Sequence, residues 1–159
     1  MKIKVFREED YKTISWSGGT TTELFIYPLD SSFSSRIFKF RLSTAKVEIE
    51  NSKFTPLQGI SRKLMVLDGQ IELIHEHHHT SQLSKFDIDE FEGAWDTQCK
   101  GTCEDFNLMT QGLTKGNIDA LTIENGQVGH HNIKDNIDWL FVYAYTGKIS
   151  CTIEASPTF

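Results

Sequence analysis

The sequence has no excess of basic residues and no long apolar run. Its 159 residues include 16 Lys and Arg against 22 Asp and Glu, which gives a formal net charge of −6. Proteins that bind nucleic acids usually present a basic stripe, and this sequence contains none, so we expect no nucleic-acid partner. No apolar run is long enough to cross a bilayer, and the start lacks the basic-then-apolar pattern of a signal peptide. We therefore expect a cytoplasmic protein that binds no membrane.

Cysteine is also scarce. The chain contains three, Cys99, Cys103 and Cys151, and this odd number does not suggest a disulfide framework. The first two are spaced C-x3-C, which is not the usual spacing of a zinc ribbon or a thioredoxin. Buried, reduced thiols are therefore the preferred interpretation, ahead of metal ligands.

No window has a convincing helical period longer than two turns. Short apolar or alternating runs, separated by turn residues, instead predict an all-β sandwich or barrel. The stretch 13–23 contains two glycines and four threonines and is predicted to be a loop leading into a strand. We expect strands at residues 2–6, 22–27, 37–49, 64–67, 71–74, 82–89, 103–109, 118–124, 139–145 and 148–154.

The strongest turn signal is Asp68-Gly69, which lies between two apolar runs and predicts a β-hairpin. Thr146-Gly147 predicts a second hairpin, and the sequence around it, AYTGKISCTI, resembles VLDGQIELI around the first. This loose recurrence indicates two related halves, of which the second is short.

Residues 75–79 read His-Glu-His-His-His. Imidazoles near a carboxylate are common ligands of transition metals. However, the run begins where an apolar strand ends, so we place it at the tip of a hairpin, where three ligands cannot converge on a barrel interior. An exposed, solvated loop over residues 77–79 is therefore preferred to a metal site. Possible completing ligands are Glu90, Glu92 and His130.

Two arginines, Arg41 and Arg62, lie on apolar strand stretches. The alternation in 37–49 places Arg41 on the same face as Val47, which should be buried. A buried guanidinium needs a partner, because an uncompensated buried charge costs several kcal/mol (order of magnitude). Glu23 and Asp105 are candidate partners, and so is an anionic ligand, since the guanidinium fork fits a carboxylate. On the sequence alone, a structural ion pair and a ligand site both stay open.

Read in order, a set of short motifs resembles the HutD/Ves family, and it spans roughly residues 13–111. The order of the whole set carries the resemblance. Its members are Trp16-Ser17-Gly18-Gly19, Thr22-Glu23-Leu24, Phe40-Arg41-Leu42-Ser43-Thr44-Ala45, Phe54-Thr55, Gly59 to Arg62, Leu67-Asp68-Gly69, Phe91-x-Gly93 and Asp105-Phe106-Asn107-Leu108-Met109.

The resemblance implies a cupin-type fold, often a bicupin in one chain. It also implies an association with histidine-utilisation operons and a small-molecule-binding or regulatory role rather than an established catalytic activity. The suggested ligands are products of histidine breakdown such as formylglutamate or formiminoglutamate. This chain departs from the commoner pattern at Ser17, where an Asn is usual, and in a first loop about two residues shorter.

These observations predict an all-β, cupin-like double-stranded β-helix or β-sandwich barrel, bicupin-like with an abbreviated second half. Residues 1–111 would form the first barrel, and residues 112–159 would pack on it as a partial second half. No cofactor is expected. A homodimer is expected, because Phe38, Phe40 and Leu42 leave apolar surface to cover.

The preferred function is binding of a carboxylate such as formylglutamate between Arg41 and Arg62. Polar neighbours would come from Glu23, Ser43, Asp105 and Asn107, apolar walls from Trp16 and Phe54, and free amides from Gly18 and Gly19. The rival is a metal-dependent cupin enzyme that uses His75, His77, His79 and a carboxylate. A third alternative is an interaction module whose exposed strands pair with another chain.

Overall fold

The computed structural model describes residues 3–133 and 136–152. It divides into two compact units, Met1–Ala120 and Leu121–Phe159. Among the described residues of the first unit, the regular structure is β-strand apart from two single-turn 3₁₀ helices, Glu8–Asp10 and Phe33–Ser35. The strands are β1 (Lys12–Trp16), β2 (Gly19–Tyr27), β3 (Phe40–Val47), β4 (Asn51–Lys53), β5 (Ile60–Gly69), β6 (Ile71–His75), β7 (Thr80–Leu83), β8 (Ile88–Glu92), β9 (Thr97–Lys100) and β10 (Cys103–Gln111).

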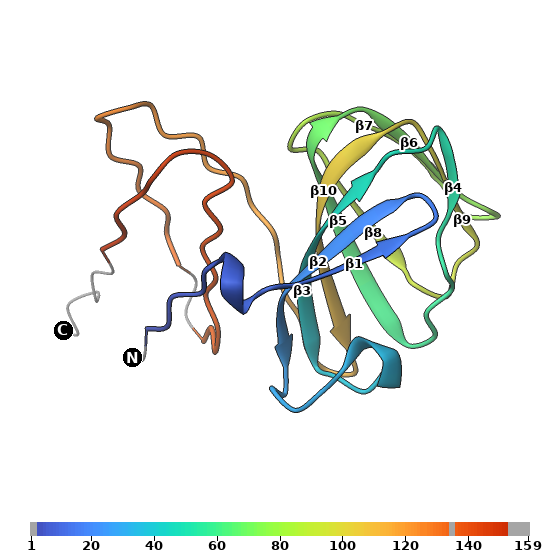
Figure 1. Cartoon of the computed structure of the whole chain (residues 1–159), viewed down its shortest axis with the longest axis horizontal. Coiled ribbons are helices and arrows are strands. Elements are labelled where there is room, and N and C mark those ends of the chain that lie inside the picture. The colour runs from blue at the N-terminus through green and yellow to red at the C-terminus, as the bar shows by residue number, and fades with distance from the viewer. Residues whose placement is uncertain (1–2, 134–135, 153–159) are drawn as a thin grey trace. The chain divides into compact units, whose positions relative to one another are not determined.

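The strands form two antiparallel sheets that face each other (Figure 1). The larger sheet has the order β1-β2-β3-β10-β5-β8, and the smaller has the order β4-β9-β6-β7. Apolar side chains from both sheets meet between them, as period-two alternation requires of a sandwich or barrel. One core cluster is made of Val47, Leu64, Val66, Ile71, Leu73, Leu83, Phe91, Cys99 and Cys103, and a second of Ile26, Phe38, Leu57, Ile60 and Met109. The predicted all-β, cupin-like architecture is confirmed.

The Asp68-Gly69 turn is not the hairpin that the sequence predicted. β5 pairs with β10 and β8, whereas β6 pairs with β7 and β9, so the chain crosses from one sheet to the other at this point. Gly69 has φ +87°, and a Cβ there would lie 2.4 Å from the carbonyl oxygen of Thr102. Glycine is needed because the return crossing from β9 to β10 passes close by. The dipeptide therefore indicates a sharp bend, and not which strands pair.

The predicted loop at residues 13–23 is also wrong, because this stretch forms the β1–β2 hairpin. Its threonines are β-branched and favour extended backbone, and Ser17-Gly18 makes the turn between Trp16 and Gly19. The predicted strand at residues 2–6 is absent over the described residues 3–6, which have no regular structure.

The strands predicted at residues 118–124 and 139–145 are absent, and residues 148–152 of the last predicted strand have no regular structure either. The remaining residues of that last strand lie outside the described residues. Alternation indicates which face a strand would bury, but a strand also needs a partner to pair with. Large apolar side chains of the second unit are exposed, among them Leu121, Trp139 and Val142. That residues 112–159 form a partial second cupin half stays a prediction.

Two smaller expectations depend on burial. Cys99 and Cys103 are buried free thiols as expected, whereas Cys151 is exposed. Phe38, Phe40 and Leu42 are buried within the chain, so they cannot supply the apolar surface on which the expected homodimer partly rested. No helix among the residues that the structure describes is long and apolar enough to span a membrane.

Candidate functional site

The strand register arranges the inner face of the larger sheet in rows of paired residues. Two neighbouring rows contain polar side chains among apolar ones. Each row crosses β2, β3, β10, β5 and β8. The first row is Ile26, Arg41, Met109, Arg62 and Phe91. The second is Glu23, Ser43, Asn107, Leu64 and Asp89. The sheet therefore brings together most of the predicted polar residues, although they come from distant parts of the chain.

Arg41 is held by its own polar partners. Its Nε donates to Glu23 Oε2 at 2.7 Å and its Nη1 donates to Ser43 Oγ at 3.0 Å. The guanidinium carbon lies 4.3 Å from the ring centre of Phe33. Only 3% of Arg41 is exposed, so Glu23 compensates a charge that water cannot reach. Of the two alternatives left open by the sequence, the structural ion pair describes Arg41.

Arg62 has a different environment. Its Nη2 donates to Asn107 Oδ1 at 3.0 Å, and its guanidinium carbon lies 4.7 Å and 4.9 Å from the ring centres of Phe54 and Phe91. Among the described residues, none accepts a hydrogen bond from its buried Nε. The partner of Arg62 is thus a neutral amide and two aromatic rings, and no carboxylate forms a direct ion pair with it within the described chain.

Asp105 lies behind Asn107 rather than beside Arg62. Asn107 Nδ2 donates to Asp105 Oδ1 while its own carbonyl accepts from Arg62, so the amide links the two charged groups. Burial raises the pKa of Asp105 to about 7, against the lowering effects of Arg62 and of hydrogen bonds from Asn107, Cys103 and Ala45. Burial also lowers the pKa of Arg62 to about 10; Asp105 opposes this shift and Arg41 adds to it. Near pH 7, Asp105 is therefore only partly ionised and neutralises Arg62 incompletely.

Trp16, Gly18 and Gly19 do not lie beside the arginines. Gly19 pairs with Val47, six residues along β3 from Arg41, a distance of about 20 Å along a strand. The Trp16 ring covers Gly18, where a Cβ would lie 2.2 Å from Trp16 Cζ3. These residues shape the β1–β2 turn, and their amides cannot reach an anion at Arg62.

The His-rich run is split by the structure. His75 ends β6 and is buried, which contradicts its predicted place in a solvated hairpin tip. Its Nε2 lies 2.7 Å from Asp89 Oδ2 and its Nδ1 lies 2.8 Å from Thr97 Oγ1. His79 Nε2 lies 2.9 Å from Asp89 Oδ1. His77 is exposed as predicted and takes no part in this cluster.

Sequence reasoning missed Asp89 and Thr97. A signal for Asp89 was present in residues 88–91, where Asp89 alternates with the exposed Ile88 and Glu90 and shares the buried face with Phe91. Nothing comparable identified Thr97, because a strand threonine is common. Glu90, a candidate metal ligand, instead forms an ion pair with Lys63.

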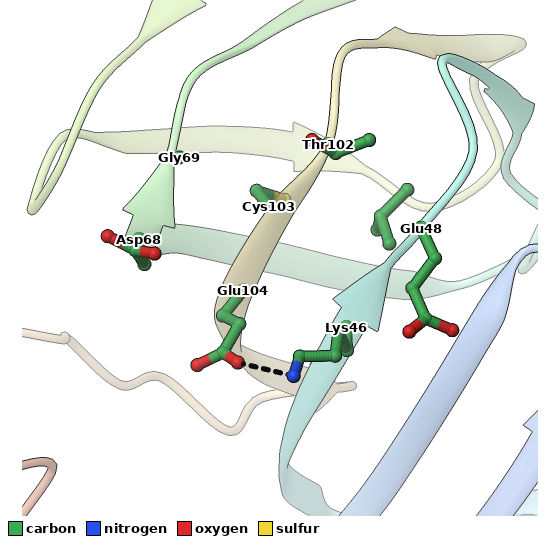
Figure 2. Close-up of a pocket in the computed structure, with 8 residues that line it drawn as sticks. Lys46, Glu48, Asp68, Gly69, Thr102, Cys103 and Glu104 are labelled. Carbon is green, nitrogen blue, oxygen red and sulfur yellow. Dashed lines mark ion pairs between the residues drawn. The ribbon is translucent and has the colours of Figure 1, made fainter.

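A surface pocket of about 390 Å³ lies where β3, β5 and β10 meet the sheet crossings (Figure 2). Its ionisable groups are Lys46, Glu48, Asp68 and Glu104, and Lys46 Nζ lies 3.0 Å from Glu104 Oε1. Three carboxylates against one ammonium give this pocket a negative potential. It therefore does not suit a carboxylate ligand, and Arg62 is the better candidate anchor.

The two facing antiparallel sheets define a cupin-fold protein, with a polar interior built around Arg62 and His75. The structure of ectoine synthase from P. lautus is 10% identical over 70% of this chain and 80% of that chain, with a TM-score of 0.57, and supports the fold alone. The HutD family model matches residues 8–158, so the chain belongs to the HutD family.

Two further solved structures agree with this assignment. HutD from Pseudomonas fluorescens SBW25, determined in a formate condition, is 27% identical over 66% of this chain, with a TM-score of 0.56. The conserved protein PA5104 from Pseudomonas aeruginosa PAO1 is 28% identical over 66% of this chain, with a TM-score of 0.58. The matched region spans 58% and 55% of those two chains, respectively. No curated protein matches the sequence.

Proposed function

We propose that the chain binds a small carboxylate inside the barrel, with Arg62 as its anchor. The observation that carries this proposal is the buried Nε of Arg62, which has no acceptor among the described residues. An unsatisfied buried donor costs roughly 1–3 kcal/mol, and a carboxylate oxygen would remove this cost. The guanidinium fork also offers two parallel donors to one carboxylate.

The charges around Arg62 support the same ligand class. Arg41 is neutralised by Glu23, whereas Arg62 faces Asn107 and an Asp105 whose pKa is raised to about 7 by burial. When Asp105 is protonated, it no longer compensates the positive charge of Arg62, and the carboxylate of the ligand compensates it instead. A carboxylate ligand with a pKa near 4 stays ionised down to pH 6, so its affinity should increase as the pH falls from 8 to 6.

One of the solved relatives suggests a first ligand to test. HutD from Pseudomonas fluorescens was determined in a formate condition, and formate is the smallest carboxylate. Formylglutamate carries carboxylates and a formyl group, and it fits the histidine-utilisation role that the family resemblance implies. We propose a cytoplasmic binding or regulatory protein, a location consistent with the free thiols of Cys99 and Cys103.

Thermal unfolding in the presence of ligands tests the proposal. Formate, formylglutamate, glutamate, urocanate and simple dicarboxylates are added to the wild type, Arg62→Ala and Arg62→Lys. A ligand at about a hundred times its Kd stabilises by roughly 2.7 kcal/mol, which corresponds to a rise of roughly 5–10 °C in Tm. We expect Arg62→Ala to abolish this rise and Arg62→Lys to reduce it, because lysine lacks the planar fork.

Lys63→Ala is the matched control. Lys63 neighbours Arg62 on β5 but points to the opposite face, where it pairs with Glu90. It should keep the full ligand-induced rise. If no carboxylate stabilises the wild type, or if Lys63→Ala loses the rise as completely as Arg62→Ala, Arg62 is not the anchor of a carboxylate site.

A further inference from the structure

Asp89 lies between two imidazoles at one edge of the barrel. His75 is the last residue of β6, His79 precedes β7, and Asp89 belongs to β8. The cluster therefore connects the smaller sheet with the larger one. One donor atom from each of the three residues lies within 4.8 Å of the others.

We propose that His75, His79 and Asp89 bind a divalent transition-metal ion, with Zn²⁺ as the best-fitting ion. Two imidazole nitrogens and a carboxylate are typical zinc ligands, with bonds of about 2.0–2.2 Å. A tetrahedral ion with such bonds separates its ligand atoms by about 3.3 Å. His75 Nε2 lies 2.7 Å from Asp89 Oδ2 and His79 Nε2 lies 2.9 Å from Asp89 Oδ1, so the three side chains already converge and would have to move apart to admit the ion.

The hydrogen bond between His75 and Thr97 allows this exchange at His75 without leaving its second ring nitrogen unpaired. With no metal bound, Nε2 of each imidazole contacts one oxygen of the Asp89 carboxylate. With the ion bound, both nitrogens coordinate through their lone pairs, and each imidazole carries its proton on Nδ1 instead.

Thr97 provides the outer-shell partner for the metal-bound form. Thr97 Oγ1 lies 2.8 Å from His75 Nδ1. When the proton of His75 is on Nδ1, the Thr97 hydroxyl can accept a hydrogen bond from this N–H group. The same hydroxyl can then donate to the carbonyl oxygen of Trp95 at 3.4 Å. Metal-bound histidines usually donate their second N–H to such a partner, which fixes the tautomer and the orientation of the ring.

The turn after β6 places His79 over His75. His77 adopts φ +65°, and the amide of His75 donates to the carbonyl of His79 at 2.9 Å. His78 stacks on the Trp95 ring at 3.7 Å between centroids, which secures the turn. The side chain of His79 is 39% exposed, so an ion can enter from solvent and keep a water as its fourth ligand.

This ligand set differs from the one that the His-rich run suggested. The side chain of His77 is 88% exposed, and its Nε2 lies 3.6 Å from Glu76 Oε1 rather than near His75. Asp89, which lies fourteen residues from His75 in sequence, takes the place of His77 in the ligand set. The same difference supplies a matched control, because His77 and His79 belong to one turn and only His79 would bind.

Titration of tag-free protein with Co²⁺ tests the site, since tetrahedral Co²⁺ absorbs strongly in the visible range. We expect the wild type to bind one Co²⁺ per chain with a tetrahedral spectrum, and Zn²⁺ to displace it. His79→Ala and Asp89→Asn should weaken binding at least about tenfold, because even outer-shell changes typically cost 10–100-fold. Thr97→Val should weaken it roughly tenfold, and His77→Ala should leave it unchanged.

His79→Ala is the deciding variant, because its partly exposed side chain can be removed with little risk to folding; far-UV circular dichroism verifies that it folds. The proposal is overturned if the wild type gives no tetrahedral Co²⁺ spectrum. It is equally overturned if His77→Ala loses as much affinity as His79→Ala, which would indicate chelation by the exposed run. Neither result depends on carboxylate binding at Arg62.

Discussion

Asp105 gives the sharpest test of the electrostatics of the barrel interior. Burial raises its pKa from an ordinary value of 3.8 to about 7, a shift of about 3 pH units. Each unit corresponds to about 1.36 kcal/mol, so an ionised Asp105 destabilises the fold by about 4 kcal/mol. Asp105→Asn removes the ionisation while keeping an oxygen that can accept from Asn107.

The sign of the effect follows from proton binding. Between pH 4 and 7 the folded protein keeps a proton on Asp105, whereas the unfolded chain has released it. Stability therefore decreases as the pH rises through this window, and the loss is complete above pH 7. The loss for this one group cannot exceed about 1.4 kcal/mol per pH unit.

Urea unfolding of wild type and Asp105→Asn at pH 4.5, 5.5, 6.5 and 7.5 measures the effect. Other titrating groups are common to both proteins, so the difference between the two free energies of unfolding isolates Asp105. We expect this difference, wild type minus Asp105→Asn, to fall by roughly 3 kcal/mol over the series, a change of roughly 1–3 M urea in midpoint. Asp68→Asn, an exposed carboxylate on β5, should not show it. Parallel pH profiles for wild type and Asp105→Asn would refute the reasoning.

Three further outcomes are expected. In urea unfolding, Gly69→Ala should destabilise the protein by roughly 2–4 kcal/mol and Gly112→Ala by only about 1 kcal/mol. Both glycines have positive φ, but only at Gly69 would a Cβ lie against a neighbouring carbonyl. Sedimentation velocity should show a homodimer at high micromolar concentration, since two-fold association is the commonest way to cover exposed apolar side chains, and a monomer would count against it. Far-UV circular dichroism should be β-dominated, and a helix content above about a third would contradict the fold.

The sequence predicted strand faces better than strand partners. The alternation along β3 and β10 placed Arg41, Ser43, Asp105 and Asn107 on one face, and these residues are buried on the inner face of the larger sheet. Period-two geometry is local, so it can be read from a single stretch. Which strands pair depends on contacts between distant residues, and Asp68-Gly69 shows the consequence: a correct bend with the wrong partners.

The site was only partly predictable for the same reason. The ion pair of Arg41 with Glu23 and the separation of Asp105 from Arg62 by Asn107 depend on side-chain geometry across four strands. His75 was misplaced because the last residue of a strand and the first of its turn look alike in sequence.

The two candidate sites, at Arg62 and at His75, share Phe91 as a neighbour. The guanidinium of Arg62 lies 4.9 Å from the Phe91 ring centre, and the ring of His75 lies 4.5 Å from it. Burial lowers the pKa of His75, Asp89 opposes this shift, and the positive charge of Arg62 adds to the lowering, so the two positions interact electrostatically. A metal ion at His75 and an uncompensated Arg62 would repel each other, whereas a carboxylate on Arg62 would relieve that repulsion.

Binding of Zn²⁺ and of a carboxylate should therefore be mutually favourable, and by linkage each should raise the affinity of the other by the same factor. Isothermal titration of formate with and without Zn²⁺ measures that factor, and a value of one or below would show that the charges at the two sites do not interact in this way.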